Sequence, residues 1–149
     1  MRKPAGILSL LLILTAPVAS AAGYIVIVNS ANNTTSLSSR DVAALFLKKK
    51  TSWENGTPVM PVVLSDSAAA TTAFDTEILR RSANAIRAYW QQEIFSGRDV
   101  PPLEEPGDQE VVNFVQKNPG AIGFISANAP HAGVKVVSVS GALVGNPKP

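Results

Sequence analysis

The hydrophobic positions of this chain fall into short, β-branched runs separated by segments in which apolar residues recur at helical spacing. Four of these runs are too short for helices and are bounded by polar or turn-forming residues, a pattern typical of buried strands. They span residues 24–28, 59–64, 121–125 and 134–139. Strands that alternate with helical segments predict an α/β fold.

The segment after Ser38 predicts an amphipathic helix. Ser38 is the expected N-cap, and Asp41, three positions on, places an acidic group in the first turn. Val42, Leu45 and Phe46 follow at helical spacing and form one apolar face.

Two further helices are expected in the second half of the chain. One begins after Ser82 and ends near Gly97, a residue that suits a C-cap. Its buried core stripe is expected to contain Ile86, Tyr89, Trp90 and Ile94. The other spans residues 108–118, with Val111, Val112 and Val115 facing inward.

The central stretch, residues 59–79, predicts a strand, a tight turn and a helix. The apolar run ends at Leu64, and Ser65-Asp66-Ser67 forms the turn before a run of small residues. Ala70, Phe74 and Ile78 recur every four residues and are expected to face the sheet. Such a turn directs free backbone N–H groups and the positive end of the helix dipole at one point. Because open α/β sheets bind ligands beyond the carboxyl ends of their strands, a binding site is expected here.

The N-terminal residues have the pattern of a secretory signal peptide. Arg2 and Lys3 are followed by an apolar run over residues 7–14 and by Ala19-Ser20-Ala21, which suits a signal peptidase. We expect residues 1–21 to be cleaved, residues 22–140 to form the domain and residues 141–149 to be a loose tail. The alternative is an uncleaved membrane anchor, but a spanning helix needs about 20 apolar residues.

Charge and composition exclude several classes of function. The net charge of +2 comes from 13 basic and 11 acidic side chains, and loss of Arg2 and Lys3 makes the mature chain neutral. Neither nucleic acid nor a polybasic membrane contact is therefore expected. With no cysteine and a single histidine, His131, we expect no thiol chemistry, no metal site and no cofactor.

Four local features each allow a functional and a structural interpretation. Lys48-Lys49-Lys50 is an anion-attracting patch or a helix end whose cations match the dipole. Trp53 stacks on a ligand or covers the edge of the core. His131 is a solvated loop residue or has a direct role. The Pro-rich residues 100–107, which include the adjacent acids at 104 and 105, are expected to form an ordered connection.

Several short motifs occur in an order that resembles a known family. They are Ser36-Leu37-Ser38, Phe46-Leu47-Lys48, Trp53 followed by Gly56-Thr57-Pro58-Val59, and Asn118-Pro119-Gly120-Ala121-Ile122-Gly123-Phe124. Within the last motif Gly123 is expected to permit close approach of the backbone. Over residues 24–139 the chain is similar to the phosphate-binding proteins of phosphate ABC transporters and to the wider type II periplasmic binding proteins. The resemblance implies a single three-layer α/β/α lobe with a mixed sheet of about four or five strands.

The chain departs from that family at the ligand turn. Leu64 stands where the family has an arginine, and Ala68-Ala69-Ala70 replaces a Ser-Gly-Thr run. Asp66 matches the acid that takes up the proton of bound phosphate in the family. Each charge-assisted bond to phosphate contributes about 1.5–3 kcal/mol, so the missing groups imply weak binding. The remaining ligand candidates are Ser65, Asp66, Ser67, Thr71 and Thr72. Alternatively, Asp66 or Ser67 only caps the helix.

These features lead to two hypotheses for function. The first is a periplasmic module that binds phosphate or another small anion in uptake or sensing. The second is an interaction module without a ligand, which docks on a membrane sensor, transporter or porin. An enzyme is not expected, because the sequence has no nucleophile elbow and no obvious acid–base pair.

Overall fold

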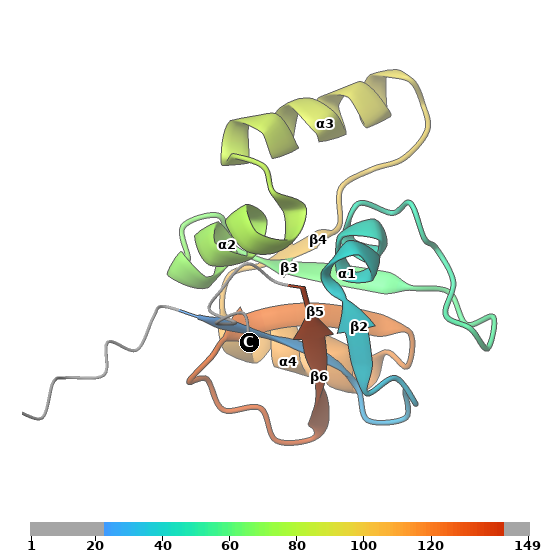
Figure 1. The fold of residues 1–149 in the computed structure, drawn as a ribbon, viewed down its shortest axis with the longest axis vertical. Helices are drawn as coiled ribbons and strands as arrows, with labels where there is room; N and C mark the ends of the chain where they lie inside the picture. The colour runs from blue at the N-terminus through green and yellow to red at the C-terminus, as the bar shows by residue number, and fades with distance from the viewer. Residues whose placement is uncertain (1–22, 142–149) are drawn as a thin grey trace, which may run out of the picture.

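The computed structural model describes residues 23–141 and contains a six-stranded mixed sheet (Figure 1). The expected signal peptide, and the expected tail beyond Gly141, lie outside the described residues. The strands are β1 (Tyr24–Asn29), β2 (Ser36–Ser38), β3 (Met60–Leu64), β4 (Leu103–Glu105), β5 (Ala121–Ser126) and β6 (Val134–Ser140). Their order is β2-β6-β1-β5-β3-β4. β1 runs antiparallel to β5 and β6, whereas β3 runs parallel to β4 and β5.

Helices cover both faces of this sheet. The helical elements are α1 (Ser39–Phe46), α2 (Ala69–Phe74), the π-helical turn η1 (Asp75–Leu79), α3 (Ala83–Phe95) and α4 (Asp108–Lys117). On one face, the ring of Phe74 from α2 stacks on Phe124 of β5 at 4.1 Å and meets Phe46 of α1 at 4.8 Å. α4 packs on the other face with its three valines buried. The expected three-layer α/β/α lobe is confirmed.

Gly123 marks the close contact between β5 and α4. A Cβ atom at this position would lie 2.8 Å from Val62 Cγ1 and 2.9 Å from Val111 Cγ1. The expectation that glycine permits close approach here is therefore confirmed.

The sheet is larger than expected because two short strands lie outside the four predicted strands. β2 extends the sheet beyond β6, and β4 forms the opposite edge beside β3. Each has three residues and one neighbour. Strands at sheet edges need no long apolar run, so the hydrophobic pattern does not reveal them.

The helix starts that were predicted from capping residues are confirmed. Ser38 Oγ accepts the N–H of Asp41 at 3.0 Å, and Ser82 Oγ accepts the N–H of Ala85 at 3.2 Å. Trp53 is also part of the core rather than a free aromatic. Its indole N–H donates to the carbonyl of Gly120 at 2.9 Å, and the side chain is buried.

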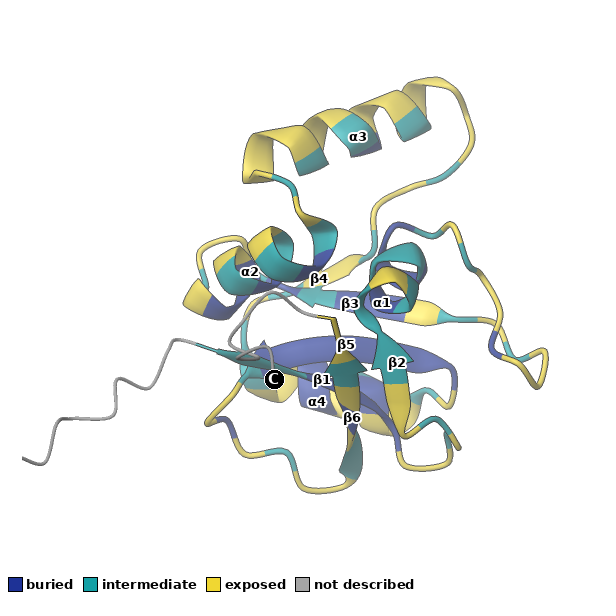
Figure 2. Cartoon of the chain, in the orientation of Figure 1, coloured by how far each residue is buried: buried dark blue, intermediate teal, exposed yellow. Residues whose placement is uncertain are grey.

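The expected burial of α3 is confirmed for only one of its four stripe residues. Trp90 is buried, although it lies outside the main core cluster, whereas Ile86 and Tyr89 are half-buried. Ile94 is 52% exposed and its neighbour Phe95 is 92% exposed. α1 and α2 already cover this face of the sheet, so α3 lies as an outer element with most of its surface in solvent (Figures 1 and 2).

None of the helices within residues 23–141 has the length and apolar character needed to span a membrane.

Candidate functional site

The strand, turn and helix predicted around residues 59–79 are present at the carboxyl end of β3. β3 ends at Leu64, whose side chain is only 2% exposed and belongs to the core. Ser65, Asp66 and Ser67 form the turn, and α2 begins at Ala69. The buried leucine therefore leads directly into a polar, solvent-facing turn.

The expectation that Asp66 or Ser67 caps α2 is wrong. The N-cap is Ala68, and no side chain accepts a hydrogen bond there. The turn is closed instead by the N–H of Ala68, which donates to the carbonyl of Ser65 at 3.0 Å. The hydroxyls of Ser65 and Ser67 lie 3.1 Å apart and face each other across the turn.

The two threonines of α2 have different environments. Thr71 is buried, and its hydroxyl donates to the carbonyls of Leu64 and Ser65 at 3.1 and 2.8 Å. This hydroxyl ties the helix to the end of the strand, and its proton is already engaged. Thr72 is exposed on the outer side of α2. Of the two, only Thr72 presents a hydroxyl to solvent.

The backbone of the turn retains donors for a ligand. Within the described residues, the N–H groups of Asp66, Ala69 and Ala70 have no protein acceptor. The N–H of Ser67 has only a long contact of 3.5 Å to Ser65 Oγ. Free N–H groups at a helix start favour an anion, because they combine hydrogen bonding with the positive end of the helix.

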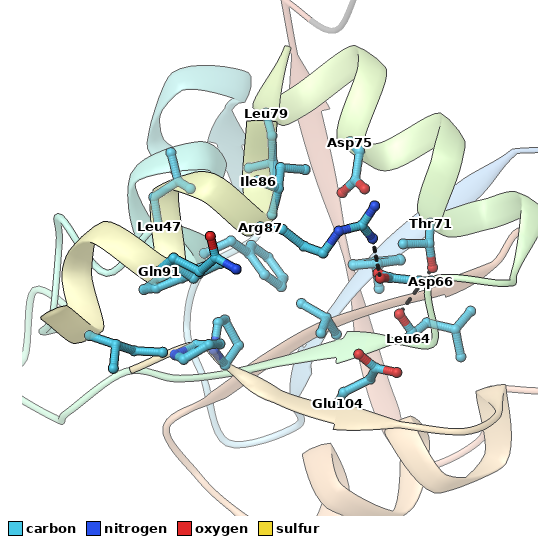
Figure 3. Close-up of a pocket in the computed structure, with 17 residues that line it drawn as sticks. Leu47, Leu64, Asp66, Thr71, Asp75, Leu79, Ile86, Arg87, Gln91 and Glu104 are labelled. Atoms are coloured by element: carbon cyan, nitrogen blue, oxygen red, sulfur yellow. Dashed lines mark hydrogen bonds and ion pairs between the residues drawn. The ribbon is translucent and has the colours of Figure 1, made fainter. Parts of the chain in front are cut away.

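The side chain of Asp66 points toward α3 rather than into its own helix. Its carboxylate lies 3.6 Å from the Arg87 guanidinium, and both side chains are more than half exposed (Figure 3). An exposed pair of this kind contributes little to stability. It does, however, engage the one arginine that lies beside the turn.

A cavity of about 300 Å³ lies between α3 and the carboxyl end of β3 (Figure 3). α3 supplies one wall through its inward-facing side chains, among them Ile86, Arg87, Trp90 and Ile94. The opposite wall contains Val63 and Leu64 of β3 and Glu104 of β4. Pro101 and Pro102, from the connection between α3 and β4, also line it. Most of the lining is apolar, and its size falls in the range of small-molecule sites.

Acidic groups dominate the polar part of the cavity. Asp66, Asp75 and Glu104 supply three carboxylates, and Arg87 supplies the one guanidinium among the lining residues. Burial, followed by the nearby charge of Asp66, raises the pKa of Asp75 from 3.8 to about 6. Neither Asp75 nor Glu104 forms an ion pair with another described residue. The cavity therefore has an excess of negative charge at neutral pH.

Contacts from the end of α1 hold α3 above this cavity. The Tyr89 hydroxyl donates to the carbonyl of Leu47 at 3.0 Å. Lys48 Nζ lies 3.3 Å from the Asp99 carboxylate, which follows α3. The Arg81 guanidinium lies 4.9 Å from the centre of the Tyr89 ring. The first two contacts tie α3 to the end of α1, and the third is local to α3, because Arg81 lies just before the helix.

Sequence reasoning found the turn but missed the cavity and its charged residues. Asp75 lies on the helix predicted to pack on the sheet, and Arg87 lies beside a stripe that was assigned to the core. Glu104 falls in the Pro-rich segment that was expected to form an ordered connection, and it is exposed while it also lines the cavity. The sequence does contain one sign of this charged wall. Arg87 precedes Trp90 by three residues, so it shares a helical face with that tryptophan.

The other candidate groups lie elsewhere. α1 ends at Phe46, so the three lysines follow the helix rather than form its last turn, and Lys48 pairs with Asp99. His131 Nδ1 lies 2.9 Å from the carbonyl of Ala129 in its own loop. Among the described residues, no group of three or more His, Asp or Glu side chains could hold a metal ion.

Solved structures with a similar fold include proteins described as phosphate transport proteins. One from Clostridium perfringens, assigned as a phosphate ABC transporter substrate-binding protein and containing bound phosphate, has 22% identity and a TM-score of 0.64, over 81% of this chain and 46% of that chain. An ABC-type phosphate transport receptor from Vibrio cholerae has 18% identity and a TM-score of 0.64, over 85% and 48% of the two chains. PstS from Borrelia burgdorferi has 14% identity and a TM-score of 0.62, over 81% and 48%. This chain therefore spans about half the length of each similar protein.

The likeness to these structures shows a shared fold, and the family follows from the sequence match. A search of curated proteins finds no match. The family model described as the PBP superfamily domain matches residues 16–146. Because this match covers most of the sequence and the structure has the corresponding lobe, the chain belongs to the periplasmic binding protein (PBP) superfamily.

Proposed function

We propose that this protein is a periplasmic solute-binding module that holds phosphate or a related small oxyanion weakly at the turn after β3. The observation that carries the proposal is the set of free backbone N–H groups at Asp66, Ala69 and Ala70. They lie at the carboxyl end of a strand, where open α/β sheets bind ligands. Phosphate bound in the structure from Clostridium perfringens supports the choice of ligand.

Weak binding follows from the side chains at this turn. Leu64 is buried and offers no charge, Ala68 caps α2 without a hydroxyl, and the Thr71 hydroxyl is engaged by two carbonyls. Asp66 repels a dianion but accepts a hydrogen bond from the O–H of a monoanion. Ser65, Ser67 and Thr72 remain as exposed or half-exposed hydroxyl donors. We expect a Kd in the millimolar range, which corresponds to about 4 kcal/mol of binding free energy.

The proposed setting is phosphate uptake or sensing outside the cytoplasm. Export is supported by the signal pattern in residues 1–21. A transporter or membrane sensor is the proposed partner, because the similar solved structures are phosphate transport proteins. Substrate binding without catalysis is proposed on the same family grounds.

N-terminal sequencing of the protein recovered from periplasm tests the proposed export. It should find a mature start at Ala22 or Gly23, and an intact Met1 would contradict export with cleavage.

A thermal-shift series with phosphate, arsenate and sulfate tests the ligand. We expect phosphate to raise the melting temperature at millimolar concentration, and Ser67→Ala to weaken the effect about threefold to tenfold. Ser30→Ala is the matched control, since Ser30 is an exposed loop serine far from the turn in sequence. Equal shifts with phosphate and with chloride at the same ionic strength would refute the phosphate assignment.

The second candidate function is an interaction module that docks on a transporter, sensor or porin. The observation that favours it is a group of exposed apolar side chains on α3 and after it, namely Ile94, Phe95, Val100 and Leu103. Exposed apolar patches of this kind mark protein interfaces. A pull-down from periplasmic and membrane extracts should recover a partner with the native chain and lose it with Phe95→Ser. A clean absence of partners would count against this function.

A further inference from the structure

We propose that the cavity beneath α3 binds a small amphipathic cation, a protonated amine carried on an apolar or aromatic body. This site adjoins the backbone donors of the turn, with Asp66 bordering both, and it goes beyond the proposed anion binding. The inference rests on the cavity itself, on the balance of charge around it and on its aromatic wall.

The cavity has the size and shape of a ligand site. Its volume is about 300 Å³, and α3, which forms one wall, is tied to the end of α1 through Tyr89 and the Lys48–Asp99 pair. Its lining is mostly apolar, with polar groups at a few positions. This combination suits a ligand that has an apolar body and one polar end.

The charges select a cation. Arg87 lies beside Asp66, so its positive charge is already offset by one carboxylate before a ligand enters. Asp75 and Glu104 also line the cavity and have no ion-pair partner among the described residues. An anion that entered would face three carboxylates, whereas a protonated amine would find two that lack a cation.

The aromatic wall favours the same class of ligand. Trp90 is buried although it lies outside the core, and it lines the cavity from α3. An indole ring attracts a cation over its face and packs well against an apolar body. A metal ion fits less well, because the described carboxylates do not converge into a metal-binding group.

A matched set of three probes tests the charge requirement on the full chain. The probes are 2-phenylethylamine, neutral 2-phenylethanol and anionic 3-phenylpropanoate, which share an aromatic body. The readout is the indole N–H resonance of Trp90, with Trp53 as the internal reference, because Trp53 lies in the core beside Gly120. We expect the amine to shift Trp90 saturably and to bind at least tenfold more tightly than the other two probes.

Two variants test which groups receive the amine. Asp75→Asn combined with Glu104→Gln should weaken amine binding at least tenfold while the Trp53 resonance stays in place. Glu54→Gln is the control, since Glu54 is an exposed carboxylate outside the cavity. Equal binding of the amine and the carboxylate, an unmoved Trp90 resonance, or a double variant that binds as well as the native chain would overturn the proposal.

The proposals of amine binding and of phosphate binding can be refuted independently of each other. Phosphate binding is followed on the backbone amides of Ala69 and Ala70, which do not line the cavity. Amine binding that persists at saturating phosphate supports a separate cavity site. Competitive displacement of the amine by phosphate would overturn the claim that the two sites are separate.

Discussion

At the scale of single residues, the turn after β3 keeps free backbone donors but lacks the side chains that the resembling phosphate-binding family has there. The donors that come from the main chain remain free, whereas Leu64 and Ala68 supply neither charge nor hydroxyl. Asp66 faces Arg87 and keeps it from a ligand. Whether the turn attracts or repels phosphate therefore depends mainly on the Asp66 carboxylate.

Asp66→Asn should strengthen phosphate binding at pH 8 about threefold to tenfold. The substitution removes a negative charge that repels the dianion, and it releases Arg87 as a charge-assisted donor. At pH 6 the gain should shrink, because the native carboxylate accepts a hydrogen bond from the monoanion. Calorimetric titration at both pH values measures the effect. Weaker binding by the variant at pH 8 would contradict this account of the turn.

Asp75 should make the folded state less stable as the pH rises from about 4 to 7. Its folded pKa of about 6 exceeds the ordinary value of 3.8, so the folded state binds more protons than the unfolded state between these values. Asp75→Asn removes this loss and should raise the free energy of unfolding at pH 7 by about 1 kcal/mol, after discounting for solvent screening.

Urea unfolding at pH 4.5 and pH 7 measures this effect of Asp75. The control is Glu54→Gln, which removes a carboxylate of equal charge outside the cavity. The other charged groups that face the cavity, Asp66, Arg87 and Glu104, are unchanged in both variants. A stability gain for Asp75→Asn that is as large at pH 4.5 as at pH 7 would contradict a raised pKa.

Gly123→Ala should lower the free energy of unfolding by about 1–3 kcal/mol through overpacking between β5 and α4. The added methyl group would lie within 2.9 Å of side-chain atoms of Val62 and Val111. Gly107→Ala is the control, because its methyl group would meet only the flexible end of Glu110. Similar urea midpoints for Gly123→Ala and the native chain would show that the β5–α4 contact can relax.

At the scale of elements, α3 is an outer strap rather than a core helix. Its apolar stripe has the spacing of a buried helix, but the sheet face that it would cover is already occupied by α1 and α2. The helix is held by the hydroxyl of Tyr89 and by the Lys48–Asp99 pair, and its outer end carries the exposed Phe95. Few contacts on one side of an element predict low local stability.

Tyr89→Phe should loosen α3 without loosening the sheet. Loss of the hydrogen bond to Leu47 should increase hydrogen exchange of α3 amides about fivefold, which corresponds to about 1 kcal/mol. Amides of β1 and β5 should keep their protection. Gln92→Ala is the control on the same helix, since this exposed side chain has no described partner. Equal exchange in Tyr89→Phe and the native chain would show that the hydroxyl does not hold the strap.

At the scale of the whole molecule, the sequence predicts the centre of the fold better than its periphery. β1, β3, β5 and β6 and the faces of α1 and α4 follow from hydrophobic spacing, because burial requires that spacing. β2 and β4 are edge strands with one neighbour each, so their pairing depends on the rest of the sheet. The role of Trp90 could not be predicted, since a helical stripe does not reveal which surface lies opposite it. The cavity lies between α3 and the carboxyl end of β3, which do not pack directly against each other.

We predict that this single lobe binds phosphate at one turn and nowhere else with similar affinity. An NMR titration of the full chain with phosphate, at constant ionic strength, tests this claim most directly. We expect saturable shifts of the amides of residues 66–72, with a Kd in the millimolar range, and little change in β1, β5 and β6. Amides at the turn that do not move, or shifts that sodium chloride reproduces, would contradict the claim.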